Sequence, residues 1–354
     1  MNPGIKFKNP ATAFMLFLVL FFFGISELVG AVIHFSGIPN DVFNSLWFLI
    51  LMQVVRLILP LAIWLAITND SFKRHMPAQP MDTLNCVYVF FFTLLIIPGM
   101  MFISGITSQF VDNDVAELLS GFASAGHPWW LMMLAIAVTP GIVEEVVFRG
   151  YIQSASSGKI AKIAVLNGFL FGIMHFNLHQ FAYTFILGVV FAYILYFTRN
   201  IWAAIFSHFI INGSQVSFMY WVMRSYEYGE EIADISLAQA MYNSLADTDP
   251  DMAQRMYDLF YGINEELFAV AIIGVIAIGT TIGAVFLFRM FIAHNLKRNA
   301  EFDTKNITQE PEINEFPSME IEENKLPLHA KIDWCLVSVV GIYITITLIL
   351  PRMV

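Results

Sequence analysis

The apolar positions of this chain form long continuous runs, and the polar residues gather in the shorter stretches between them. A helix needs about 20 consecutive apolar residues to cross the hydrocarbon core of a bilayer. Nine runs are candidates for such spans: Ala13–His34, Phe43–Ile67, Cys86–Ile106, Trp129–Tyr151, Ile160–Phe176, Phe181–Phe197, Ile201–Met223, Leu267–Ile292 and Trp334–Leu350. Strands of a membrane barrel would alternate in hydrophobicity, which these runs do not. The pattern therefore predicts an all-α, polytopic transmembrane helical bundle with about eight or nine membrane-spanning helices.

The fifth and sixth runs are short, and only Asn177–Gln180 separates them. So short a connection predicts that the two helices form a tight antiparallel hairpin. Gly168 and Gly172 in the fifth run have the small-residue spacing that lets a neighbouring helix approach closely.

Composition supports a membrane protein and excludes other classes. The 354 residues are 58% hydrophobic and only 13% charged, against about 45–50% and about 25% in soluble domains. The net charge of −10 argues against a nucleic-acid partner, which requires a basic face. Two cysteines, Cys86 and Cys335, give no disulfide framework to interpret. The expected partner is the lipid bilayer.

The Lys and Arg residues predict the orientation. With nine spans, 14 of the 18 fall in loops on one side and three on the other, and Arg56 lies inside the second span. Basic loops face the cytoplasm. We therefore expect an integral, multi-pass protein with a cytoplasmic N-terminus and an external C-terminus.

Glu144, Glu145 and Arg149 lie inside the fourth predicted span, just after Pro140 and Gly141. Ionisable residues inside a membrane are costly and usually functional. Glu145 and Arg149 are four residues apart, so they can form a structural ion pair on one helical face. Glu144 is rotated about 100° from that face and is available as a general base or acid. The alternative is a charge cluster at a helix end, snorkelling to the interface.

Two further spans carry polar side chains. His175 lies one residue before the end of the fifth run, and an antiparallel hairpin with the fourth span would place it at the depth of Glu144. His208 and Asn212, in the seventh run, share one face, and both can donate hydrogen bonds to an oxyanion. A satisfied core histidine and polar contacts between helices are the structural alternatives.

Together these residues suffice for hydrolysis of an amide by activated water. Glu144 would take the proton of the water with help from His175, and His208 with Asn212 would face the oxyanion. Hydrolysis by this mechanism requires no cofactor. Glu144, His175 and His208 could instead hold a divalent metal such as zinc, because two histidines and one carboxylate are a known ligand set.

The order Glu144-Glu145-x-x-x-Arg149, Phe171-x-x-x-His175 and His208-x-x-x-Asn212 resembles the CPBP family. This family contains the CAAX proteases and the bacteriocin-processing or immunity (Abi) proteins, and the type II CAAX prenyl endopeptidases are related to it. The resemblance implies an intramembrane endopeptidase acting on a membrane-embedded or lipid-anchored protein. It implies that Glu144 and His175 activate water, that His208 and Asn212 form the oxyanion site, and that Glu145 and Arg149 are structural. Family members are often described as metalloproteases, although the residues equally fit a metal-free, glutamic-type mechanism.

The apolar runs, together with the resemblance over about residues 129–223, divide the chain into four regions. Residues 1–128 are N-terminal transmembrane helices and 129–223 are the catalytic core. Residues 224–266 are an acidic, aromatic extramembrane cap with helical periodicity, and 267–354 are C-terminal transmembrane helices with a polar cytoplasmic loop near 300–327.

The same residues also fit two other functions. Chains of Glu and His also relay protons in proton-coupled transporters, although no internal repeat is visible. A non-proteolytic immunity or scaffold protein could also retain the motifs. Arg56 has two readings as well: it pairs with a carboxylate elsewhere in the bundle, or it binds an acidic group of the substrate.

Overall fold

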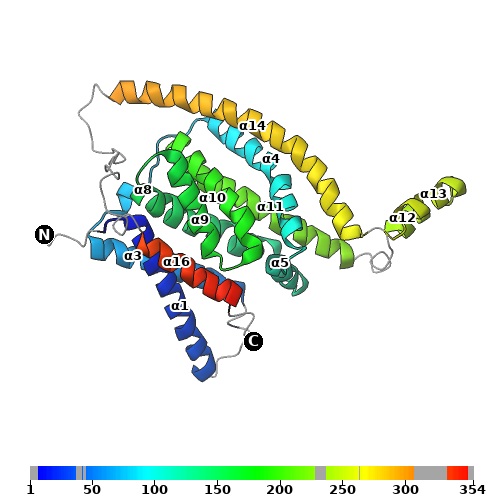
Figure 1. Ribbon diagram of the computed structural model, residues 1–354, viewed down its shortest axis with the longest axis horizontal. Helices are drawn as coiled ribbons and strands as arrows, with labels where there is room; N and C mark the ends of the chain where they lie inside the picture. Colours follow the sequence, from blue (N-terminus) through cyan, green and yellow to red (C-terminus); the bar gives the residue numbers. More distant parts are fainter. Residues whose placement is uncertain are drawn as a thin grey trace.

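The computed structural model describes residues 7–36, 42, 45–227, 237–262, 264–306 and 333–349. Within these parts of the chain the secondary structure is helical, apart from an isolated antiparallel bridge between Ala78 and Asn200. The predicted all-α class is therefore confirmed (Figure 1).

Six helical segments among the described residues are long and apolar enough to cross a membrane, which supports a multi-pass integral membrane protein. Each coincides with one of the nine predicted runs. They are α1 (Pro10–Ser36), α3 (Leu46–Thr68), α4 (Thr83–Thr107), the continuous stretch Trp129–Ala155, α10 (Leu178–Thr198) and α14 (Glu265–Asn306).

The other three predicted spans are also helices, but they differ in length or polarity from ordinary spans. Helix α9 (Ile160–Met174) has 15 residues. Helix α16 (Trp334–Ile344) has 11 and continues in the π-helical stretch Thr345–Ile349, so both described helices are shorter than the hydrocarbon core. Helix α11 (Ile201–Glu227) has 27 residues but lower hydropathy, because it carries several Ser, His, Asn and Gln side chains. Within the described residues, length and composition thus identify six candidate spans, and the number of eight or nine stays a prediction.

The polar segments between the predicted spans are partly helical. Helices α12 (Leu237–Leu245) and α13 (Pro250–Phe260) lie where the periodicity of the cap predicts them, and α5 (Asp114–Ser124) precedes the fourth span. Helix α14 continues to Asn306, so the start of the polar loop expected near 300–327 is helical. Residues 307–327 of that loop lie outside the described residues.

Buried polar contacts explain why α14 extends beyond the apolar run. Asn295 donates to the side-chain oxygen of Asn85 on α4 at 2.6 Å, and Asn299 donates to the carbonyl of Phe197 on α10 at 2.9 Å. Arg199 forms an ion pair with Asp303 at 2.7 Å. Tertiary partners therefore satisfy the polar residues of a helix that hydropathy alone would have ended.

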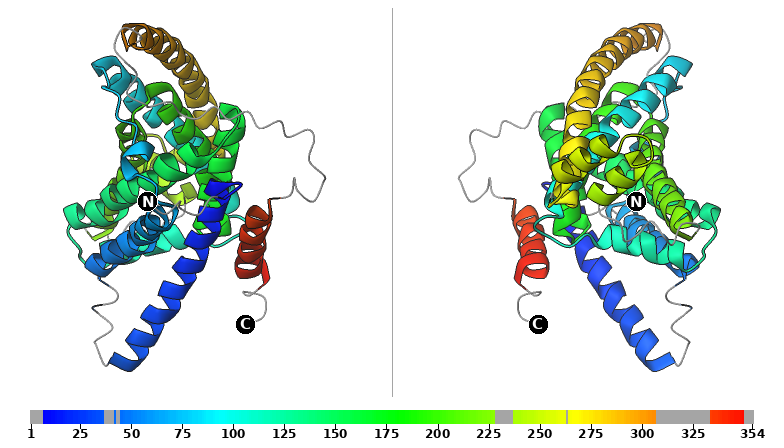
Figure 2. Two further views of the ribbon diagram at one scale, coloured as in Figure 1. Left: turned by 90° about the vertical axis from the view of Figure 1, so that its left-hand side faces the viewer. Right: turned by 90° about the vertical axis from the view of Figure 1, so that its right-hand side faces the viewer.

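Helices α9 and α10 form the expected antiparallel hairpin near the centre of the molecule, joined through Phe176 in the left-handed conformation (φ 47°). A Cβ atom on Gly168 would lie 2.5 Å from the carbonyl oxygen of Phe185, so only glycine permits this approach of the two helices. Figures 1 and 2 show α14 and α4 along one side of the hairpin and α1, α3 and α16 on the other.

The short helix η1 (Phe72–His75) connects α3 with α4 and is tied to the end of the fourth span. The buried His75 ring contacts the Ser154 hydroxyl through Nδ1 at 2.5 Å and the Asp70 carboxylate through Nε2 at 3.0 Å. This cluster holds a connecting segment against the helix that carries the acidic motif.

Candidate active site

The helix of the acidic motif is interrupted on both sides of Glu144 and Glu145. Two π-helical stretches, Leu134–Val138 and Val146–Ile152, flank α7 (Thr139–Glu145). Pro140 has no N–H group and its ring displaces the carbonyl four residues before it, so the regular hydrogen bond to Ile136 is lost. Such π segments are frequent at functional sites.

Side chains from other helices satisfy the carbonyl groups of this interrupted helix. Asn212 on α11 donates to Ile136 O at 3.1 Å, and Gln53 on α3 donates to Ala135 O at 2.9 Å. Asn167 on α9 donates to Phe148 O at 2.7 Å. The interruption therefore fixes three neighbouring helices in register with the acidic motif.

Glu145 lies at the centre of a buried charge network. Its Oε1 accepts a hydrogen bond from Arg149 at 3.1 Å, with both side chains fully buried, and it also contacts His208 Nδ1 at 2.8 Å. The Arg149 guanidinium lies 4.4 Å from the centre of the Phe171 ring and 5.0 Å from that of Phe191. The ion pair expected from the sequence is present, whereas the contact with His208 is one that sequence reasoning missed.

The contacts of His208 indicate its tautomer. Nδ1 faces a carboxylate, so it carries a proton and donates to Glu145. Nε2 lies 3.1 Å from Asn212 Nδ2, which places the lone pair of the neutral ring opposite an amide N–H. Nε2 also lies 4.0 Å from Glu144 Oε2, so it faces the second carboxylate of the motif.

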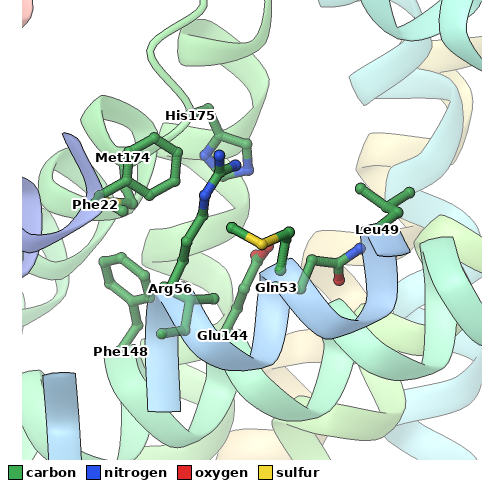
Figure 3. Close-up of a pocket in the computed structure, with 10 residues that line it drawn as sticks. Phe22, Leu49, Gln53, Arg56, Glu144, Phe148, Met174 and His175 are labelled. Carbon is green, nitrogen blue, oxygen red and sulfur yellow. The ribbon is translucent and has the colours of Figure 1, made fainter. Parts of the chain in front are cut away.

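Glu144 has a different environment from Glu145. It lines a pocket of about 120 Å³ together with His175 and Arg56, and these side chains come from α7, the end of α9 and α3 (Figure 3). Its Oε2 is buried and has no hydrogen-bond partner among the described residues. The rotation between neighbouring residues of one helix thus gives two carboxylates two different surroundings.

His175 is oriented by the chain that carries it. Its Nδ1 lies 2.8 Å from the carbonyl oxygen of Phe171, which can only accept, so Nδ1 carries the proton and Nε2 keeps its lone pair when the ring is neutral. The left-handed Phe176 ends α9 directly afterwards, and its ring packs on Phe22 and Phe23 of α1. This packing holds the end of α9 beside the pocket.

A comparison with known protein families relates the segment that carries these side chains to a described protein domain. Residues 126–214 match the family described as "Type II CAAX prenyl endopeptidase Rce1-like". This segment is an Rce1-like CAAX endopeptidase domain. Neither the curated proteins nor the solved structures contain a significant match to the chain. The family resemblance seen in the sequence is confirmed for this segment, and a domain of this family implies an intramembrane protease.

The Rce1-like domain contains all the motif residues, but the structure divides them into two groups. Glu144 and His175 lie in the pocket, whereas Glu145, Arg149, His208 and Asn212 form the network beside it. The 4.0 Å approach of His208 Nε2 to Glu144 Oε2 connects the two groups.

Sequence reasoning missed most of the pocket lining, and two of the missed residues that bear on the site lie outside the Rce1-like domain. Gln53 and Phe22 belong to α3 and α1. Gln53 could have been found, because it is a polar residue in an apolar run, three positions before Arg56. Nothing in the sequence distinguishes Phe22 from the other phenylalanines of its helix.

The donor atoms of the site do not fit a metal ion. Among the described residues, no three His, Cys, Asp or Glu side chains are arranged so that they could hold one. In the neutral ring of His208, both nitrogens already face hydrogen-bond partners, Glu145 and Asn212. The ligand set Glu144, His175 and His208, left open by the sequence, is therefore not assembled in the Rce1-like domain.

Proposed function

We propose that this protein is an intramembrane endopeptidase that hydrolyses a peptide bond of a membrane-embedded or lipid-anchored protein. The observation that carries the proposal is the pocket in which Glu144, with an unpartnered carboxylate oxygen, and His175 lie together. The Rce1-like domain supports the reaction class, because the family name describes a prenyl endopeptidase.

In the proposed reaction, water binds between Glu144 Oε2 and His175 Nε2. Glu144 accepts a proton as the oxygen of the water attacks the scissile carbonyl carbon. His175 Nε2 accepts the second hydrogen bond of the water and orients it, because its ring is fixed by the bond from Nδ1 to Phe171 O. The same proton on Glu144 then passes to the leaving amine.

His208 and Asn212 are proposed to stabilise the oxyanion. In the resting state, Asn212 Nδ2 and His208 Nε2 lie 3.1 Å apart as donor and acceptor. When His208 Nε2 also carries a proton, taken from solvent before the substrate binds and returned after product release, this nitrogen and the Asn212 amide are both donors, and the oxyanion of the tetrahedral intermediate is their common acceptor. Glu145 stabilises the charged ring through Nδ1.

Cleavage of a peptide library tests the function. The full-length protein in detergent micelles is incubated with farnesylated peptides that end in CAAX sequences, and products are identified by mass spectrometry. We expect specific cleavage, and we expect it to be abolished in Glu144→Gln, His175→Ala and His208→Ala. The matched control is Glu117→Gln, which makes the same change on the exposed surface of α5.

Two results would contradict the proposal. Full cleavage by folded Glu144→Gln would remove the proposed base from the mechanism. Absence of cleavage by the wild type, with folded protein, would favour the transporter or scaffold readings.

A further inference from the structure

Arg56 is a cation in the middle of an apolar helix and outside the Rce1-like domain. It lies near the centre of α3, a helix whose length and hydropathy suit a membrane span. A charged side chain at that depth is costly unless it has a partner or a function.

No described residue neutralises Arg56. It forms no ion pair and no hydrogen bond within the described parts of the chain, and its Nε atom is buried without a partner. Among the described residues, Arg56 makes a cation–π contact with Phe22, because its guanidinium carbon lies 4.6 Å from the centre of the Phe22 ring. Arg149, by contrast, is fully buried, whereas Arg56 is half-buried, and Arg149 has the Glu145 carboxylate as its partner. Among the described residues, no carboxylate therefore forms an ion pair with Arg56; Glu144 lines the same pocket but does not pair with it.

The position of Arg56 connects it with the proposed reaction. It lines the same small pocket as Glu144 and His175, and Figure 3 shows the three side chains extending into this pocket from separate elements. Gln53, one turn earlier on the same helix, also lines the pocket and has an unpartnered, buried Oε1. Polar groups without partners thus gather on the wall opposite the acidic motif.

A guanidinium presents N–H groups in a planar fork that matches a carboxylate. Phe22 covers one face of the fork, which leaves its edge for a ligand. The ligand must be anionic, and in a peptide substrate the anionic groups near a cleaved bond are a C-terminal carboxylate or an acidic side chain.

We propose that Arg56 binds a carboxylate of the peptide substrate and thereby selects the bond presented to Glu144 and His175. This inference rests on the proposed function and adds a specificity residue that the family match, confined to residues 126–214, does not include. Arg56 takes no part in proton transfer, so it acts on substrate binding rather than on the chemical step.

The test uses one farnesylated CAAX peptide in three forms: with a free C-terminal carboxylate, with a C-terminal amide, and with a C-terminal amide and a glutamate side chain in the last position. KM and kcat are measured with the full-length protein in uncharged detergent. A charged hydrogen bond contributes about 1.5–3 kcal/mol, so the wild type should bind the preferred acid at least about tenfold more tightly than the plain amide. The two acidic peptides show which source of carboxylate is used.

Two variants of Arg56 and one control variant test whether its guanidinium binds the carboxylate of the peptide. Arg56→Gln should raise KM for the acidic peptide about tenfold or more, with kcat nearly unchanged, and should leave KM for the plain amide as it is. Arg56→Lys should retain part of the preference, because it keeps the charge without the fork. The control Arg74→Gln removes a cation whose side chain is 72% exposed and should behave as the wild type.

Equal KM values of the wild type for all three peptides would overturn the assignment, as would a fall in kcat alone in Arg56→Gln. If Arg56→Gln does not fold, the wild-type comparison of acid and amide, together with Arg56→Lys, decides the question. If no peptide is cleaved, the proposed function fails, and binding of the three peptides to Glu144→Gln is measured instead. Preference for an acid in that experiment would retain the role of Arg56, and no preference would refute it.

Discussion

Replacing Arg149 by methionine should destabilise the folded protein by about 3–5 kcal/mol, because it leaves the buried Glu145 carboxylate without its cation. The structure gives the size of the effect. Both side chains are fully buried and their charged atoms lie 3.1 Å apart. At that distance, an effective dielectric constant of about 20 gives an attraction of about 5 kcal/mol.

Additional contacts act in the same direction. Arg149 also donates to the carbonyl of Gly188 at 3.2 Å, a hydrogen bond from a charged group that the variant loses. Methionine retains most of the apolar volume between Phe171 and Phe191, so loss of packing is not the main term. The hydrogen bond from His208 to Glu145 remains in the variant and limits the loss.

Thermal unfolding of the purified protein in detergent provides the assay, with cleavage measured in parallel. A loss of this size corresponds to a fall in Tm of about 5–15 °C. The double variant Glu145→Gln with Arg149→Met removes both charges and should recover much of the lost stability, because a buried pair can be replaced by neutral groups at little cost. Arg74→Met, at an exposed cation, is the control for the same chemical change.

An Arg149→Met variant that melts at the wild-type temperature would refute a stabilising role for the buried ion pair. Lost activity with normal stability would then assign Arg149 to the reaction itself. A double variant as unstable as the single one would show that the charge interaction is not what stabilises this part of the bundle.

Four further predictions concern the mechanism, the fold and the topology. Asn212→Ala should lower kcat about 10²–10³-fold, as loss of one oxyanion donor does, and an unchanged kcat would remove Asn212 from the oxyanion site. Chelators such as EDTA and phenanthroline should leave the rate unchanged, because the donors are not arranged for a metal; inhibition that added zinc reverses would contradict this. Burial lowers the pKa of His75 despite the opposing effect of Asp70, so the neutral ring contributes stability that is fully present above about pH 6.5 and is lost as the pH falls through that value towards the lowered pKa. Tm measured from pH 8 to pH 5 should therefore fall more steeply for the wild type than for His75→Gln, and parallel curves would refute it. Single cysteines at Ser157 and Ser244 in a cysteine-free background test the orientation: an impermeant reagent outside intact cells should label position 244 and not 157, and the reverse pattern would invert the topology.

Local sequence was sufficient for much of the fold. Six of the predicted runs are long apolar helices, and the tight α9–α10 hairpin follows from its short connection and from Gly168. These features depend on neighbours in the chain or on composition, so hydropathy and spacing contain the information. The end of α14 was not predictable in this way, because Asn295 and Asn299 remain helical through partners on α4 and α10.

The same distinction holds for the site. The sequence by itself determined the residue types, the i,i+4 pairing of Glu145 with Arg149 and the separation of Glu144 from that pair, since helical geometry fixes these relations. Only the tertiary structure decided that His208 bonds to Glu145, that Asn212 satisfies the carbonyl freed by Pro140, and that Arg56 enters the pocket of Glu144 and His175 without a partner. Those contacts join residues far apart in the chain, and their geometry depends on how the helices pack, which no local pattern records.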